Sequence, residues 1–177
     1  MIKKKSEVIS IRCDKGTKEK LEHESEIKNV TLNTLVGQIL EKHSSWDRFA
    51  RELGFVFLTR PFLRALLDHV DEKAITTISV TTCRGAMRDS ILFLKGEFTL
   101  QAFLEALDLW LEASNIPFRH IKKDDRDKFI VQHDLGRKWS VYLSSVINSL
   151  LHEIKAEISN QQLGAHSLVF EIIRIKN

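Results

Sequence analysis

Apolar and polar side chains alternate strictly near the start of the chain. One set comprises Ile9, Ile11 and Cys13, and the other comprises Val8, Ser10 and Arg12. A period of two residues is that of a β-strand with one face against a core. The pattern therefore predicts a strand over residues 8–13, with a hydroxyl and a guanidinium on its outer face.

Beyond this strand the spacing of apolar and small residues becomes that of a helix. Thr17, Leu21 and Ser25 fall on one stripe of a first helix, and residues 29–30 break the pattern. Thr31 is of a type that caps helix N-termini, so a second helix is expected to start there. The apolar face of this second helix comprises Leu32, Val36, Ile39 and Leu40.

The rest of the chain shows further strand and helix patterns. We expect helices over 60–70, 84–94, 99–115 and 136–158, and strands over 74–82, 118–122, 128–133 and 167–175. The two middle strands read as a β-hairpin. This order is typical of a ferredoxin-like sandwich with one extra helix, which has a four-stranded antiparallel sheet with two long helices on one face.

The N-terminal pattern is too small to fold alone. One strand and two helices bury little apolar surface, and a lone strand leaves both edges unpaired. Two copies could solve both problems by pairing their strands antiparallel above four helices. The outer face of such a two-stranded ribbon fits the major groove of DNA.

The turn Val30-Thr31-Leu32-Asn33-Thr34 resembles the inter-helix turn of the ribbon-helix-helix family of the Arc and MetJ type, and the resemblance covers roughly residues 6–48. It implies that Val8, Ser10 and Arg12 read bases. It also implies that Thr31 caps the second helix, and that the amides near Leu32 and Asn33 hold a DNA phosphate. Val8 departs from the family's polar readers, so it would contact a thymine methyl or nothing.

The expected fold class is therefore α+β, with a ribbon-helix-helix domain over residues 1–50 and a ferredoxin-like oligomerisation or sensor domain over 51–177. This arrangement resembles that of nickel-responsive repressors. The metal site does not carry over, because the histidines of the second domain lack ligand-spaced partners. They are His69, His120, His133, His152 and His166. We expect no cofactor, although a composite metal site at Cys83 stays open.

Composition adds three constraints. The chain has 177 residues, 43% of them hydrophobic, and a net charge of +3, so it is not a general polyanion binder. Lys3, Lys4 and Lys5 precede the predicted strand and would add phosphate contacts, or else form a solvated terminus. Two widely separated cysteines, no signal peptide and no membrane-spanning apolar run predict a cytoplasmic protein.

Two places in the second domain could carry chemistry. Cys83 and Arg84 stand where a strand would enter a helix, a setting that favours a reactive thiolate. The alternative is that Cys83 is a small residue buried at the start of a helix. His133 and Arg137 flank a basic helix start that could hold an anion. The alternative is a packed turn with Trp139 in the core.

These patterns predict a sequence-specific regulator of transcription that binds double-stranded DNA as a homodimer or homotetramer and is not an enzyme. Its second domain would serve oligomerisation or sense a small-molecule or protein effector. Two alternatives stay open. One is an antitoxin-like protein-interaction module, and the other is an enzyme or thiol sensor with its site at Cys83 or His133.

Overall fold

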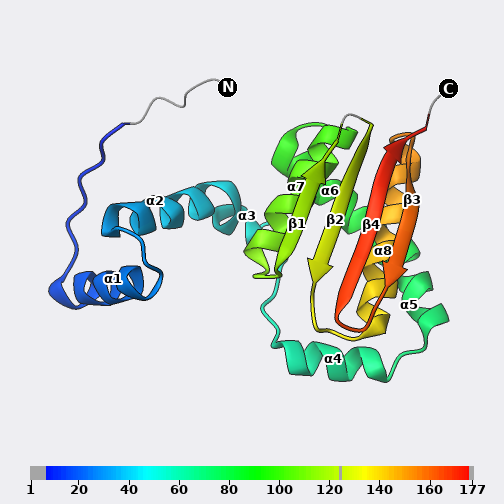
Figure 1. Ribbon diagram of the computed structural model, residues 1–177, viewed down its shortest axis with the longest axis horizontal. Coiled ribbons are helices and arrows are strands. Elements are labelled where there is room, and N and C mark those ends of the chain that lie inside the picture. Colours follow the sequence, from blue (N-terminus) through cyan, green and yellow to red (C-terminus); the bar gives the residue numbers. More distant parts are fainter. Residues whose placement is uncertain (1–6, 124, 176–177) are drawn as a thin grey trace. The chain divides into compact units, whose positions relative to one another are not determined.

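The chain forms two units, residues 1–45 and 46–177, which join between Ser45 and Trp46. The computed structural model describes residues 7–123 and 125–175 (Figure 1). The first unit contains α1 (Lys15–Ile27) and α2 (Leu32–Lys42), and a π-helical turn, η1 (His43–Asp47), follows at the junction.

The second unit has one sheet. Along the chain, most of its helices precede the strands, and one long helix lies between the second and third strands. Its helical elements are α3 (Arg48–Ala50), α4 (Arg60–Asp68), α5 (Glu72–Ile78), the π-helical turn η2 (Ser79–Cys83), α6 (Arg84–Lys95), α7 (Leu100–Ala113) and α8 (Arg137–Glu153). Its strands are β1 (Phe118–Lys122), β2 (Arg126–Gln132), β3 (Ala156–Leu163) and β4 (Ser167–Arg174).

Both helices of the first unit begin at a residue whose side chain caps them. The Asp14 carboxylate accepts the Thr17 amide at 2.9 Å, and Thr31 Oγ1 accepts the Thr34 amide at 3.1 Å. Both bonds satisfy amides that have no carbonyl one turn earlier. The prediction of a helix capped by Thr31 is therefore confirmed.

The predicted strand over residues 8–13 is wrong. Residues 7–14 have no regular secondary structure and are exposed, with Val8, Ile9 and Ile11 at 96, 72 and 58% of their full accessibility. Alternation describes where side chains would point, but a strand exists only where its amides and carbonyls meet another strand. The first unit contains no other strand among its described residues, so the expected ribbon, and with it the ribbon-helix-helix part of the fold class, is absent.

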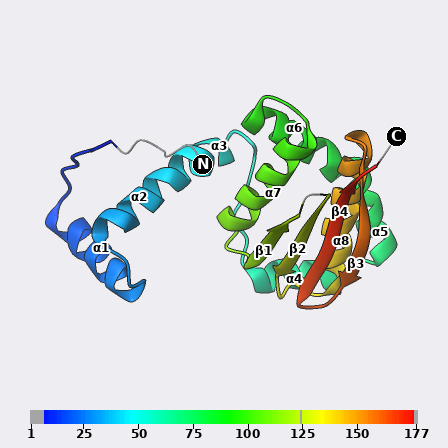
Figure 2. The same cartoon turned by 45° about the horizontal axis from the view of Figure 1, so that its top comes forward.

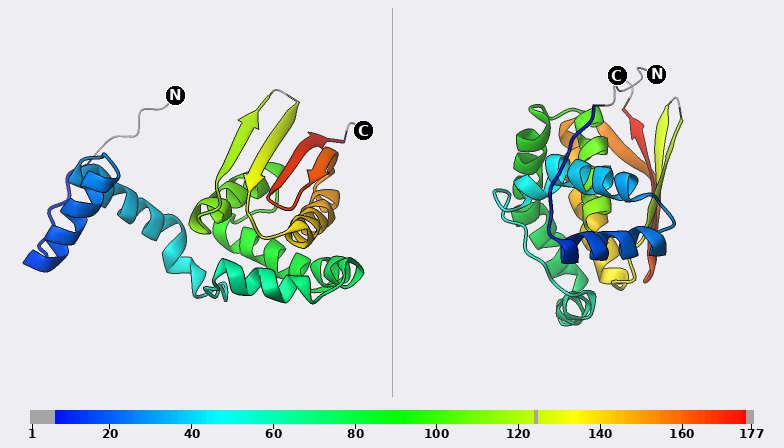
Figure 3. Two further views of the ribbon diagram at one scale, coloured as in Figure 1. Left: turned by 60° about the horizontal axis from the view of Figure 1, so that its bottom comes forward. Right: turned by 90° about the vertical axis from the view of Figure 1, so that its left-hand side faces the viewer.

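The sheet of the second unit has the strand order β1-β2-β4-β3, and all neighbours are antiparallel. The helices α7 and α8 lie on one face of it (Figure 2 and Figure 3). Between the sheet and these helices, Phe129 stacks on Phe170 with ring centroids 5.0 Å apart, and Leu111 and Leu143 are buried against them. Burial of these side chains is the main stabilising contribution in this unit.

The ferredoxin-like topology is also wrong, because the segment expected as the first strand is helical. Residues 74–82 lie within α5 and η2. Asp71 caps α5 by accepting the Ala74 amide at 2.8 Å. The hydroxyls of Thr76, Thr77 and Thr81 each donate to the carbonyl four residues earlier at 2.9 Å. The strand preference of β-branched residues depends on context, and a threonine hydroxyl within a helix can bond the carbonyl four residues earlier, as these three do.

The fourth strand is instead β3, whose first three residues fall at the end of the helix expected over 136–158. Lys155 adopts φ = 53°, and the chain turns there from α8 into β3. Since β3 is an edge strand that pairs only with β4, polar residues are tolerated on both of its faces and give no alternating pattern: Asn160 and Gln162 are exposed, and Gln161 Oε1 accepts from Ser144 of α8 at 2.6 Å.

Several other predictions in this unit are confirmed. The hairpin of β1 and β2, the final strand β4 and the helices α6 and α7 lie within a few residues of the expected ranges. Gly96 ends α6 with φ = 76°, a left-handed conformation that glycine adopts without steric cost. Thr99 caps α7 by accepting the Ala102 amide at 3.2 Å.

Candidate functional sites

The residues expected to read bases lie on the exposed segment 7–14. Val8, Ser10 and Arg12 are exposed, and within residues 7–123 and 125–175 the Arg12 guanidinium makes no ion pair or hydrogen bond. Its charge is therefore available to an anion from outside the described chain. Lys3, Lys4 and Lys5 lie outside the described residues.

The N-terminus of α2 has the expected form. Thr31 Oγ1 accepts the Thr34 amide and also lies 2.8 Å from Thr34 Oγ1. The amides of Leu32 and Asn33 belong to the first turn, where no earlier helical carbonyl can accept from them. Asn33 is exposed and Leu32 is half-buried. These groups can meet a ligand from solvent, and the helix dipole favours an anion there.

The packing of the first unit is sparse. Within residues 7–45, Leu35 and Ser25 are the only buried side chains. Its large exposed apolar side chains are Val8, Ile9, Ile11, Ile27, Ile39 and Leu40. A unit this small needs most of its apolar surface covered to be stable. Much of the apolar surface of residues 7–45 is therefore open to solvent.

Cys83 does not stand at a free helix start. It lies in η2, between α5 and α6. The adjacent Arg84 is engaged, because its Nε donates to Glu153 Oε1 at 2.7 Å. Cys83 is half-buried beside Tyr142, and burial raises the pKa of the Tyr142 hydroxyl, with Cys83 as a further cause. The two features expected to favour a thiolate, a helix N-terminus and an unpaired arginine, are thus not present at Cys83.

His133 is fully buried at the end of β2, and each hydrogen-bonding group around it has a partner. Its Nδ1 accepts the Leu135 amide at 3.0 Å, so the ring proton is on Nε2, which donates to Ser140 Oγ at 2.8 Å. Ser140 Oγ in turn donates to the Gly164 carbonyl at 2.8 Å. Burial lowers the pKa of His133 to about 4. The neutral ring is therefore a structural link between β2, α8 and the β3–β4 turn.

The cations at the start of α8 bind other parts of the same unit. Arg137 Nη1 donates to the Leu163 carbonyl at 2.7 Å, and its Nε lies 3.4 Å from Glu72 Oε1. Lys138 Nζ donates to the Asp68 carbonyl at 2.9 Å. These side chains therefore connect the start of α8 to α4, α5 and β3, and both cations have partners within the second unit.

Sequence reasoning missed a cluster between α7 and the β1–β2 hairpin. His120 Nδ1 lies 2.9 Å from both Asp108 oxygens, and its Nε2 lies 2.8 Å from Asp127 Oδ1. The ring stacks on Phe129 at 4.0 Å. The hairpin register puts His120 opposite Phe129 and on the same face of the sheet as Asp127. The register could therefore have revealed the contact between His120 and Asp127.

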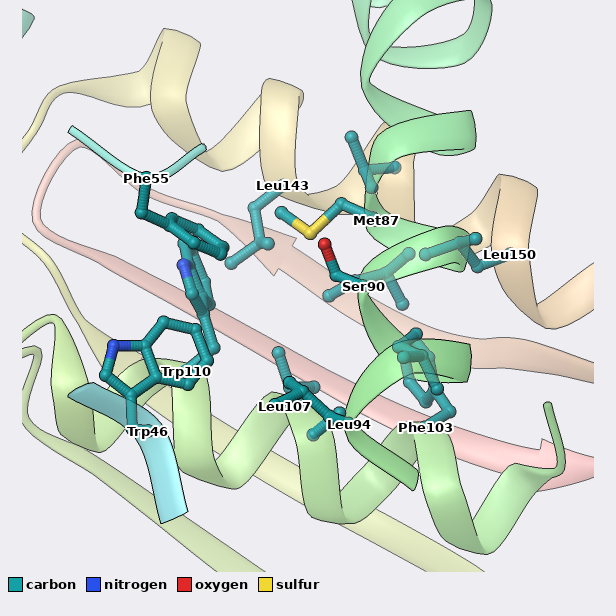
Figure 4. Close-up of a pocket in the computed structure, with 14 residues that line it drawn as sticks. Trp46, Phe55, Met87, Ser90, Leu94, Phe103, Leu107, Trp110, Leu143 and Leu150 are labelled. Carbon is teal, nitrogen blue, oxygen red and sulfur yellow. The ribbon is translucent and has the colours of Figure 1, made fainter. Parts of the chain in front are cut away.

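An apolar cavity of about 40 Å³ lies between α6, α7 and α8 (Figure 4). Trp46 and Phe55 form part of its wall, with ring centroids 5.0 Å apart. Ser90 carries the one hydroxyl of the lining, and this hydroxyl donates to the Ala86 carbonyl at 2.8 Å. An empty cavity of this size costs about 1 kcal/mol of stability.

The described residues include no group of three or more His, Cys, Asp or Glu side chains placed to hold a metal ion. Among the same residues, no helix has the length and apolar character needed to cross a lipid bilayer. Comparison with models of known families, with characterised proteins and with solved structures gave no match.

Proposed function

We propose that this protein is a sequence-specific DNA-binding regulator of transcription that acts as a dimer of its first units. The observation that carries the proposal is the state of segment 7–14. It presents Ser10 and an unengaged Arg12 to solvent, next to apolar side chains that need cover. Arginine is the side chain that most often reads guanine, and hydroxyls bind bases and phosphates alike.

A second copy of the chain is the partner that best suits the exposed apolar side chains. Ile9 and Ile11 from segment 7–14 and Ile39 and Leu40 from α2 are all at least 41% exposed. A two-fold dimer would bury the same patch on both copies, as isologous interfaces do. It would also present two copies of Arg12, which fits the two half-sites of a palindromic operator.

The remaining contacts would go to the DNA backbone. The exposed first turn of α2, with Thr31, Leu32 and Asn33, suits a phosphate, and Lys3, Lys4 and Lys5 supply further positive charge. The second unit would add oligomerisation or effector sensing. A regulator of this kind acts in the cytoplasm, where the protein's two cysteines stay reduced.

Selection from a pool of random duplexes, followed by band-shift titration of the selected site, tests the proposal. Arg12→Ala should weaken binding by about 1–3 kcal/mol and relax the preference at one base position. The matched control is Arg51→Ala, which removes an exposed arginine from the second unit and should leave binding unchanged.

Replacing Lys3, Lys4 and Lys5 with alanine should instead weaken binding to all sequences alike and flatten its salt dependence. If the full-length protein selects no sequence, or if Arg12→Ala and Arg51→Ala behave alike, the proposed DNA-binding role of segment 7–14 is refuted.

A further inference from the structure

We propose that the cavity between α6, α7 and α8 is a binding site for a small neutral apolar molecule, such as an aromatic ring or a short branched hydrocarbon. The proposal gives a site and a ligand class to the effector-sensing part of the proposed function. Its test uses no DNA, so it succeeds or fails independently of the DNA-binding role.

The lining selects this ligand class. It contains no charged side chain, and its one hydroxyl, that of Ser90, already donates to the Ala86 carbonyl. A charged or strongly polar ligand would lose its hydration here without gaining a partner. An apolar ligand would instead fill space that the aliphatic and aromatic side chains leave empty, and dry apolar cavities bind such molecules.

The size of the cavity identifies the part of its wall that must shift. Its volume of about 40 Å³ is well below the roughly 150 Å³ that accommodates a benzene ring. The rings of Trp46, Phe55 and Trp110 gather at one end of the cavity, and Phe103 and Leu150 lie toward the other (Figure 4). The wall from the three long helices belongs to the core, whereas Phe55 belongs to a segment without helix or strand.

Phe55 is the side chain best able to give way. Residues 55–59 have no regular secondary structure, and the neighbouring Val56, Phe57 and Leu58 are at least 52% exposed. An outward shift of Phe55 therefore disturbs few contacts of its own segment. It would expose the Trp46 ring that Phe55 now covers. Since Trp46 directly follows Ser45, the last residue of the first unit, ligand binding would act where the two units join in sequence.

The tryptophans provide a direct readout. Trp46 and Trp110 line the cavity, and Trp139 stacks on Trp110 with ring centroids 6.2 Å apart, so all three tryptophans of the chain lie in or beside the site. Titration of the full-length protein with toluene should give a saturable change in tryptophan fluorescence and raise the melting temperature. Benzoate, which adds a carboxylate to the same ring, should do neither.

Three variants locate the site. Ala106→Leu fills the cavity from α7 and should raise the toluene Kd at least about tenfold. Phe55→Ala removes the movable part of the wall and should lower the toluene Kd at least about threefold. Ser90→Ala removes the hydroxyl and should leave toluene binding intact, because that group has no role in an apolar complex.

The melting temperature of each variant without ligand reports whether it is folded, and Phe55→Ala, at a half-buried position outside the helices, serves as the decisive variant if Ala106→Leu unfolds. The proposal is overturned if toluene gives no saturable change in the wild-type protein. It is equally overturned if benzoate binds as well as toluene, or if Phe55→Ala leaves the toluene Kd unchanged.

Discussion

Lowering the pH from 7 to about 4 should destabilise the second unit by about 3 kcal/mol through His133 alone. The folded protein holds the pKa of His133 at about 4, against an ordinary value of 6.5. A difference of roughly 2.5 pH units between folded and unfolded states corresponds to about 3 kcal/mol.

Stability falls as the pH is lowered because His133 binds a proton more tightly in the unfolded chain than in the folded protein. The unfolded chain protonates His133 as the pH falls below 6.5, whereas the folded ring stays neutral until about pH 4. The contribution of His133 to stability is therefore complete above pH 6.5 and is lost progressively as the pH falls toward 4. Protonation of the folded ring would also place a proton on Nδ1, which now accepts the Leu135 amide.

Urea unfolding followed by tryptophan fluorescence at several pH values measures the effect. His133→Gln keeps an acceptor and a donor but does not titrate, so the difference between wild type and variant isolates the His133 contribution from the other histidines. The unfolding free energy of wild type minus that of His133→Gln should shrink by about 3 kcal/mol between pH 7 and 4. A wild-type-minus-His133→Gln difference that is flat over this range would refute the reasoning.

Two further predictions concern the other sites. Ile11→Asp should dissociate the proposed dimer, because it places a charge among the exposed apolar side chains of the first unit. Sedimentation equilibrium measures the dissociation, and a dimer of unchanged affinity would contradict the prediction. His120→Gln should lower the unfolding free energy by about 1–3 kcal/mol, because a glutamine cannot replace the hydrogen bonds of the ring to both Asp108 and Asp127. Urea unfolding at pH 7 measures this loss, and an effect no larger than that of His152→Gln would contradict it.

The sequence by itself determined the elements whose hydrogen bonds join residues near one another in the chain, within one helical turn or one hairpin. Thr31 and Thr99 cap helices, and Gly96 ends one, because each acts on amides or carbonyls a few residues away. The β1–β2 hairpin is equally local. These interactions need no distant partner, so they could be predicted from residue types and spacing.

The tertiary structure decided the elements and sites whose partners lie far along the chain. Residues 8–13 alternate as a strand would but have no strand beside them, whereas the polar β3 is a strand because β4 pairs with it. His133 reads as a candidate for chemistry until burial places it between Leu135 and Ser140. The contact of His120 with Asp108 and the cavity beside Trp46 likewise depend on helix packing, which no local pattern encodes.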